Sequence, residues 1–241
     1  MNNNRITLST TKLKKEKKIK RIIRIVLILL LLLLLIIYMA IGIVYNNSNF
    51  SITLDRNLYY DKGLIVYDDP DYKVYRSELF AVSPDTFDNI SYRWLPESLN
   101  DSRGGSHNGT NYLAYTFYVE NMGYEVADYY SEITIDDVIK GVDEAVRIRV
   151  YKNGQSTTYA KKSARDEAEK NTTPFVDDEL VALDHVENFE PGDIDKYTVV
   201  LWLEGSDPEC NDNILGGEIK ITMHFNSEHI DKKEGEYEKE K

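Results

Sequence analysis

An unbroken apolar segment near the N-terminus dominates the hydrophobic pattern of this chain. Residues 25–45 contain 21 consecutive residues without a charged side chain, and Leu27 to Ile37 is composed only of Leu and Ile. A helix of this length spans roughly 30 Å, which is the thickness of the hydrocarbon core of a bilayer. The pattern therefore predicts a transmembrane helix over residues 25–45. The alternative is a central core helix that is buried on every side in a soluble protein.

The charges that flank this segment predict its orientation. Residues 1–24 contain nine Lys or Arg and one acid, Glu16, whereas Asn46 to Asn49 is uncharged. The positive-inside bias predicts a basic cytoplasmic tail at 1–24 and places the rest of the chain outside a plasma membrane that it crosses once. A cleaved signal peptide is the rival interpretation, with a small-x-small site at Ala40 to Gly42. Signal peptides usually have a shorter apolar core of about 7–15 residues.

Beyond residue 60 the pattern changes to alternating apolar and polar positions, which is typical of half-buried strands. We expect strands at 111–120, 145–151, 197–203 and 217–225, and further strands at 63–67, 74–82 and 132–135. Residues 197–203 are apolar on both faces, which indicates a strand in the middle of a packed sheet. Asn153-Gly154 is a strong signal for a tight hairpin turn.

Short strands separated by turns predict an all-β fold, an antiparallel β-sandwich of Ig-like or jelly-roll type that follows the single transmembrane helix. We assign residues 46–60 to a linker, 61–228 to an extracellular sandwich domain and 229–241 to a disordered charged tail. Within the domain, 161–178 is charged and poor in apolar residues, and we interpret it as a long exposed loop.

The net charge of the chain indicates which kinds of partner it can bind. The whole chain has a net charge of −12, but without the basic tail the remaining 20 bases and 40 acids give −20. Such a domain repels nucleic acid, and cations or basic surfaces are its natural partners. The single cysteine, Cys210, excludes an intramolecular disulfide.

One acidic loop is the candidate site. Four carboxylates, at Glu204, Asp207, Glu209 and Asp212, lie within nine residues between two predicted strands. Carboxylate oxygens are the ligands that Ca²⁺ prefers, so the loop is a candidate calcium site, although it lacks EF-hand spacing. The alternative is a solvated acidic loop. The four histidines lack metal-ligand spacing and no catalytic motif is present, so we expect no enzyme activity and no resident cofactor other than this possible Ca²⁺.

Three segments carry a resemblance to known proteins. They are NYLAYTFYVENMG from Asn111, DEAVRIRVYKNG from Asp143 and the stretch from Pro191 to Phe225. They resemble a group of uncharacterised exported β-sandwich proteins of Gram-positive Firmicutes and, more distantly, the TasA and camelysin group. The resemblance implies a sandwich at the cell surface, which in some relatives assembles into matrix fibres. Camelysin-type relatives have been assigned metalloprotease activity, but this chain has no matching zinc motif.

These observations lead to two functional hypotheses. The first is a membrane-anchored extracellular module with a structural, adhesive or partner-binding role, which contacts an unknown surface protein or another copy of itself through its sheet edges. The second is a cation-dependent binding module or a camelysin-like metalloprotease. A cleaved, secreted matrix protein is the corresponding alternative if the apolar segment is a signal peptide.

Overall fold

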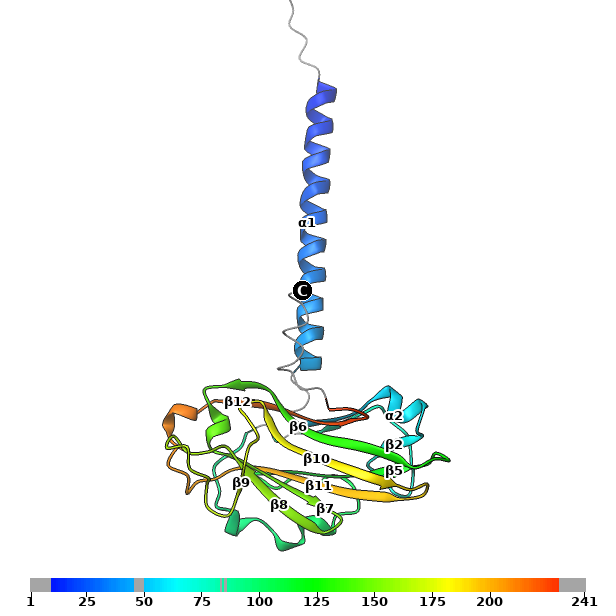
Figure 1. The fold of residues 1–241 in the computed structure, drawn as a ribbon. Helices are drawn as coiled ribbons and strands as arrows, with labels where there is room; N and C mark the ends of the chain where they lie inside the picture. The colour runs from blue at the N-terminus through cyan, green and yellow to red at the C-terminus, as the bar shows by residue number, and fades with distance from the viewer. Residues whose placement is uncertain (1–9, 46–49, 83, 85, 230–241) are drawn as a thin grey trace, which may run out of the picture. The chain divides into compact units, whose positions relative to one another are not determined.

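A computed structural model describes residues 10–45, 50–82, 84 and 86–229. The chain divides into an N-terminal helical unit and a larger β-rich unit, which begins at Ser48 (Figure 1). The predicted tail 229–241 lies outside the described residues except for His229, and so do residues 1–9 of the basic tail.

Helix α1 (Thr10–Tyr45) makes up the described part of the N-terminal unit. Within it, Lys17–Met39 is a stretch of 23 residues that contains an 18-residue window with a mean hydropathy of 3.2 and no buried part. It is long and apolar enough to cross a membrane, in agreement with the predicted apolar helix. The helix begins before residue 25 because Lys and Arg in the basic flank are themselves good helix formers.

The β-rich unit is a sandwich of two packed sheets, as predicted (Figure 1). One sheet has the order β10-β6-β12-β1-β3, formed by Leu180–Phe189, Ala127–Ile139, Glu218–Asn226, Phe50–Leu54 and Glu78–Ala81. The other has the order β2-β5-β11-β7-β8-β9, formed by Leu64–Tyr67, Leu113–Asn121, Ile194–Leu203, Val146–Lys152, Gln155–Ala160 and Thr173–Pro174, with β4 (Gly105–Ser106) paired to β5.

Aromatic side chains fill the space between the two sheets. Phe117 on β5 and Tyr197 on β11 are stacked at 5.4 Å between ring centroids, and both contact Phe225 on β12 of the opposite sheet, at 5.8 and 5.4 Å. All three are almost completely buried. Alternation along each strand directs these residues inward, so the period-two pattern of the sequence is also the pattern of the core.

The four principal predicted strands correspond to β5, β7, β11 and β12, each displaced by at most three residues at its ends. Asn153 and Gly154 have positive φ values of 51° and 86° and form the turn between β7 and β8, as predicted. Strand β11 lies between β5 and β7, and its outer face is covered by a small cluster in which Leu95 and Leu99 pack against Trp202. This second covering layer explains why residues 197–203 are apolar on both faces.

The predicted linker 46–60 is wrong from Phe50 onward. Strand β1 pairs with β12 in parallel and with β3 in antiparallel orientation, and it is followed by the short helix α2 (Arg56–Tyr60). Phe50, Ile52 and Leu54 are buried in the core. The segment therefore belongs to the sandwich. The β1–β12 pair and the β8–β9 pair are parallel, so the sandwich is not wholly antiparallel.

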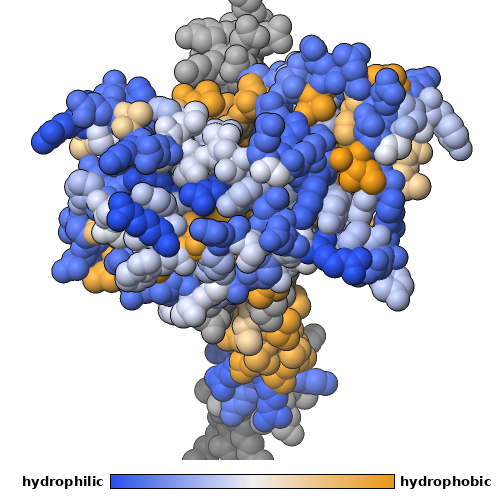
Figure 2. Space-filling model, turned by 90° about the horizontal axis from the view of Figure 1, so that it is seen from below, coloured by the Kyte–Doolittle hydropathy of each residue, from blue (hydrophilic) through white to orange (hydrophobic). Residues whose placement is uncertain are grey.

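Two other elements depart from the predicted ones. The strand expected at 132–135 is the much longer β6, and β10 was not predicted because charged residues on its exposed side interrupt the apolar alternation. The predicted loop 161–178 contains the short strand β9 and the buried Phe175. Figure 2 shows one face of the β-rich unit, where hydrophilic residues predominate and hydrophobic ones form small separate patches.

Candidate functional site

The acidic loop 204–212 starts where the central strand β11 ends. The backbone N–H of Glu204 donates to the carbonyl oxygen of Ala145 at 2.9 Å, and the N–H of Gly205 donates to that of Ile90 at 3.0 Å. These bonds attach the start of the loop to the segments on both sides of β11. The loop is therefore held by a rigid strand and two neighbouring segments.

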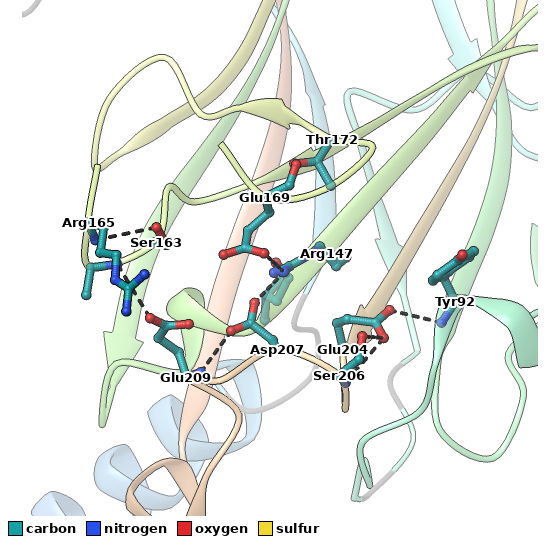
Figure 3. A network of polar contacts seen from close by, with 12 residues as sticks. Tyr92, Arg147, Ser163, Arg165, Glu169, Thr172, Glu204, Ser206, Asp207 and Glu209 are labelled. Atoms are coloured by element: carbon teal, nitrogen blue, oxygen red, sulfur yellow. Dashed lines mark hydrogen bonds and ion pairs between the residues drawn. The ribbon is translucent and has the colours of Figure 1, made fainter. Parts of the chain in front are cut away.

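Glu204 is a buried carboxylate whose acceptor positions are used within the protein (Figure 3). Its Oε2 accepts from the indole N–H of Trp202 at 3.0 Å and from the backbone N–H of Tyr92 at 2.9 Å. Its Oε1 accepts from the hydroxyl of Ser206 at 2.7 Å. Burial alone raises the pKa of this carboxyl, but the hydrogen bonds from Trp202, Ser206 and Tyr92 outweigh it and hold the pKa below its ordinary value. Glu204 therefore closes the end of β11 rather than facing a ligand.

Arg147 on β7 is the centre of the second half of the site. Its guanidinium pairs with the fully buried carboxylate of Asp207 and lies 3.5 Å from the carboxylate of Glu169 (Figure 3). The Arg147 side chain itself is only 5% exposed. The cluster thus joins three segments that are far apart in the sequence: strand β7, the loop 161–172 and the loop 204–212.

Asp207 and Glu209 are neighbouring carboxyl groups whose pKa values shift in opposite directions. Burial raises the pKa of Asp207, but hydrogen bonds from Glu209 and Arg147 reverse that effect and lower it below its ordinary value. The pKa of Glu209 is raised, mainly through its side-chain hydrogen bond to Asp207 and then through burial. Glu209 Oε1 accepts from the backbone N–H of Ala164 at 3.4 Å, whereas its Oε2 is buried and accepts no hydrogen bond from the described residues.

The structure brings together only part of the predicted calcium site. Carboxylate oxygens of Asp207 and Glu209 lie within 4.8 Å of each other and of Glu169. Glu204 faces Trp202 instead, and Asp212 is exposed at the start of the 3₁₀ helix η4 (Asp212–Ile214). The predicted four-residue ligand set is therefore not a single site in the part of the chain that the structure describes.

The guanidinium of Arg147 already supplies the positive charge that this acidic cluster needs. A Ca²⁺ ion takes six to eight oxygen ligands, and the buried carboxylate of Asp207 is bonded to Arg147 instead. The arrangement is thus suited to holding two loops against β7. Sequence reasoning missed Arg147 and Glu169, because neither alternation nor loop composition indicates which charge a distant loop covers.

Comparisons with known proteins give no family for this chain. No protein-family model matches it, and no curated protein matches it. Among solved structures, the crystal structure of a β-glucosidase from Kluyveromyces marxianus in complex with glucose is similar to it, with 12% sequence identity and a TM-score of 0.23. The match covers 71% of this chain and 16% of the β-glucosidase. A likeness this low carries no argument about fold or activity.

Proposed function

We propose that this protein is a membrane-anchored β-sandwich module that binds a partner at the bacterial cell surface. The observation that carries the proposal is α1, in which residues 25–39 carry no charged side chain and are exposed on every face. Apolar side chains around the whole circumference of a helix are stable in lipid, where the intrahelical hydrogen bonds satisfy the backbone.

The charge of the flanking segments supports an external sandwich. Nine bases precede the apolar segment, and positive charge is retained on the cytoplasmic side of membranes. The resemblance of the strand segments to exported proteins of Gram-positive bacteria supports a bacterial surface as the location.

The edges of the sandwich support a binding role. Strand β3 ends the five-stranded sheet, and among the residues that the structure describes it pairs with one strand, β1. Phe80 in β3 and the neighbouring Val82 are 53% and 68% exposed. A sheet edge that presents apolar side chains is a common place for another chain to dock.

The test is site-specific labelling in intact bacterial cells with a membrane-impermeant maleimide. Two single-cysteine variants are made in a Cys210→Ser background: Tyr124→Cys, at a side chain that is 101% exposed in the sandwich, and Asn3→Cys, in the basic tail. We expect the first to be labelled in intact cells and the second only after lysis. Labelling of Tyr124→Cys only after lysis would overturn the proposed orientation.

Mass spectrometry of the native N-terminus in the membrane fraction completes the test. An intact chain supports the anchored module. A soluble chain that begins near Ile43 would replace the anchor with a cleaved signal peptide, and a secreted matrix role would follow.

A further inference from the structure

Strand β10 is the second edge of the five-stranded sheet. It pairs with β6 on one side, and among the described residues its sheet has no strand on the other side. Alternate residues of an edge strand direct their N–H and C=O groups away from the sheet, where another chain can pair with them. Figure 1 shows β10 along the near edge of the sheet that contains β6.

The edge formed by β10 and its flanking turns is strongly acidic. Residues 171–195 contain no Lys or Arg. Seven exposed acids lie in this stretch: Asp177, Asp178, Glu179, Asp184, Glu187, Glu190 and Asp193. Bases from other segments pair with two of the seven, Lys161 with Asp178 at 3.4 Å and Lys152 with Asp184 at 2.8 Å, and the seven acids still outnumber these two bases at the surface.

A cavity of about 410 Å³ opens at the C-terminal end of this edge. Its walls come from both sheets: residues 186–189 of β10, residues 193–195 at the start of β11, and Lys152 with Asn153 at the turn after β7. The pairing of β10 with β6 shifts register between Val186 and Phe189, which places Glu187 and Asn188 in the cavity wall. Sites that take a small ligand or a side chain commonly have volumes of roughly 300–1,000 Å³.

The base of the cavity is fixed by a buried polar network. Asp195 is 8% exposed, accepts from the side-chain amide of Asn153 at 2.6 Å and is bonded to the hydroxyl of Tyr129. The ammonium of Lys152 lies 3.7 Å from the buried Asp195 and 2.8 Å from the exposed Asp184 beside the cavity, so it offsets the charge of Asp195 at the base. Glu187 and Asp193 then supply the remaining negative charge at the mouth.

We propose that the β10 edge and its cavity bind an extended basic segment of a partner protein, with one Lys or Arg side chain of that segment in the cavity. Charge complementarity selects this occupant, because β10 and its flanking turns together carry seven exposed acids. The register shift and the charges also prevent unselective pairing of edges. A second copy of this chain would bring its own acidic β10 edge against the first, so self-pairing at β10 is disfavoured. The proposal rests on the partner-binding function proposed above and specifies one binding edge and its ligand.

The experiment uses the full chain in nanodiscs of zwitterionic lipid, which do not attract basic peptides. The probe is a fluorescent eight-residue peptide of alternating Lys and Thr, and binding is measured by fluorescence anisotropy. The comparison peptides replace Lys with Glu, or carry an N-methyl group on every residue so that no backbone N–H of the peptide can donate a hydrogen bond to β10. We expect only the unmodified basic peptide to bind, with an affinity that decreases between about 50 and 200 mM salt.

The decisive variant removes two charges at the mouth of the cavity, Glu187→Gln with Asp193→Asn. We expect its affinity for the basic peptide to be about tenfold weaker. The matched control, Glu97→Gln with Glu218→Gln, removes two exposed charges elsewhere, and we expect its affinity to be unchanged. Equal weakening in both variants would overturn the proposal in favour of the general field of the acidic domain. Equal binding of the N-methylated peptide would overturn strand pairing.

The absence of peptide binding to the unmodified protein would also overturn this inference. It would leave the surface module intact as long as Tyr124→Cys is labelled in intact cells. If Tyr124→Cys is not labelled in intact cells, the proposed function is wrong, and this result does not depend on the peptide-binding experiment.

Discussion

Arg147 and Asp207 form a buried ion pair whose stability depends on both partners. Neither side chain is more than 5% exposed, so removal of one partner leaves the other charged and without compensation in a dry environment. The pair joins the loop 204–212 to β7, and the contact of Arg147 with Glu169 adds the loop 161–172. Its loss is therefore expected to affect the folded state as a whole.

We expect Arg147→Ala to lower the free energy of unfolding by about 3–5 kcal/mol, the usual cost of breaking a buried ion pair. The control is Arg103→Ala, which breaks a pair with Asp71 in which both side chains are more than half exposed. An exposed pair contributes about 0–1 kcal/mol, so the control should remain close to the wild type. Urea unfolding of both variants measures the difference. Equal free energies of unfolding for the two variants would show that Arg147 is not the centre of the network.

A second replacement separates the effect of the two charges on stability from the effect of the volume of their side chains. Changing Arg147 to Met together with Asp207 to Leu removes both charges and retains much of the volume. Apolar replacement of a whole buried pair is often neutral or stabilising. We expect the double variant to recover most of the stability that Arg147→Ala loses.

Glu204 makes the stability of the domain dependent on pH. Its pKa is below the ordinary value of 4.5 in the folded state, so its contribution is present above that value and is lost as the pH falls through the lowered folded pKa. The contribution of Asp207 to stability depends on pH in the same direction, because its pKa is also lowered. The pKa of Glu209 is raised, so its contribution is present below its ordinary pKa and is lost as the pH rises through the raised folded pKa.

We expect Glu204→Gln to be less stable than the wild type at neutral pH by about 1.5–3 kcal/mol, because it loses charge-assisted hydrogen bonds to buried donors. The difference should decrease as the pH falls below the ordinary value of 4.5 and through the lowered folded pKa, because the wild-type carboxyl then takes up its proton. Urea unfolding across this pH range gives the answer. Glu97→Gln, at an exposed carboxyl, is the control, and a difference independent of pH would contradict the assignment to ionised Glu204.

At the scale of elements, β1 decides where the folded domain begins. Its inward residues Phe50, Ile52 and Leu54 are buried, and its backbone pairs with β12 and β3. Without β1, the sheet loses the strand that joins β3 to the rest, and the edge of β12 is exposed.

We expect a chain that starts at Ser48 to unfold in a single cooperative transition. A chain that starts at Asp61, after the predicted linker, should aggregate or lack such a transition, because it loses β1 and the buried Leu58. Circular dichroism melting and size-exclusion chromatography distinguish the two. Equal stability of both chains would show that residues 50–60 are a linker that the folded domain does not need.

At the scale of the whole molecule, α1 is long and apolar enough to cross a membrane, and the proposed anchoring depends on it. A charged residue at the centre of a membrane span costs about 2.5–3.5 kcal/mol for insertion. We therefore expect Leu30→Arg combined with Leu33→Arg to move the protein from the membrane to the soluble fraction. Leu30→Ile combined with Leu33→Ile is the matched control and should stay in the membrane. Retention of the Arg variant in the membrane would show that another part of the chain holds it there.

The sequence by itself determined the features that depend on local patterns. These are the apolar helix, the period-two strands that form the core, the turn at Asn153 and the buried position of β11. Each follows from spacing along a few residues, because burial on one face of a strand or on all faces of a helix leaves a repeating signature. The acidic loop was also found in this way, and it contains Asp207 and Glu209.

Tertiary structure alone decided which distant segments meet. Arg147 pairs with Glu169, 22 residues further along the chain, and with Asp207, 60 residues further along, and β1 pairs with a strand near the other end of the chain. The tertiary structure also places Glu204 and Asp212 away from Asp207 and Glu209, with which the sequence had grouped them as a candidate calcium site. Alternation reports which face a residue occupies, but the choice of neighbour is made by packing and hydrogen bonding across the whole fold, which leave no periodic signal.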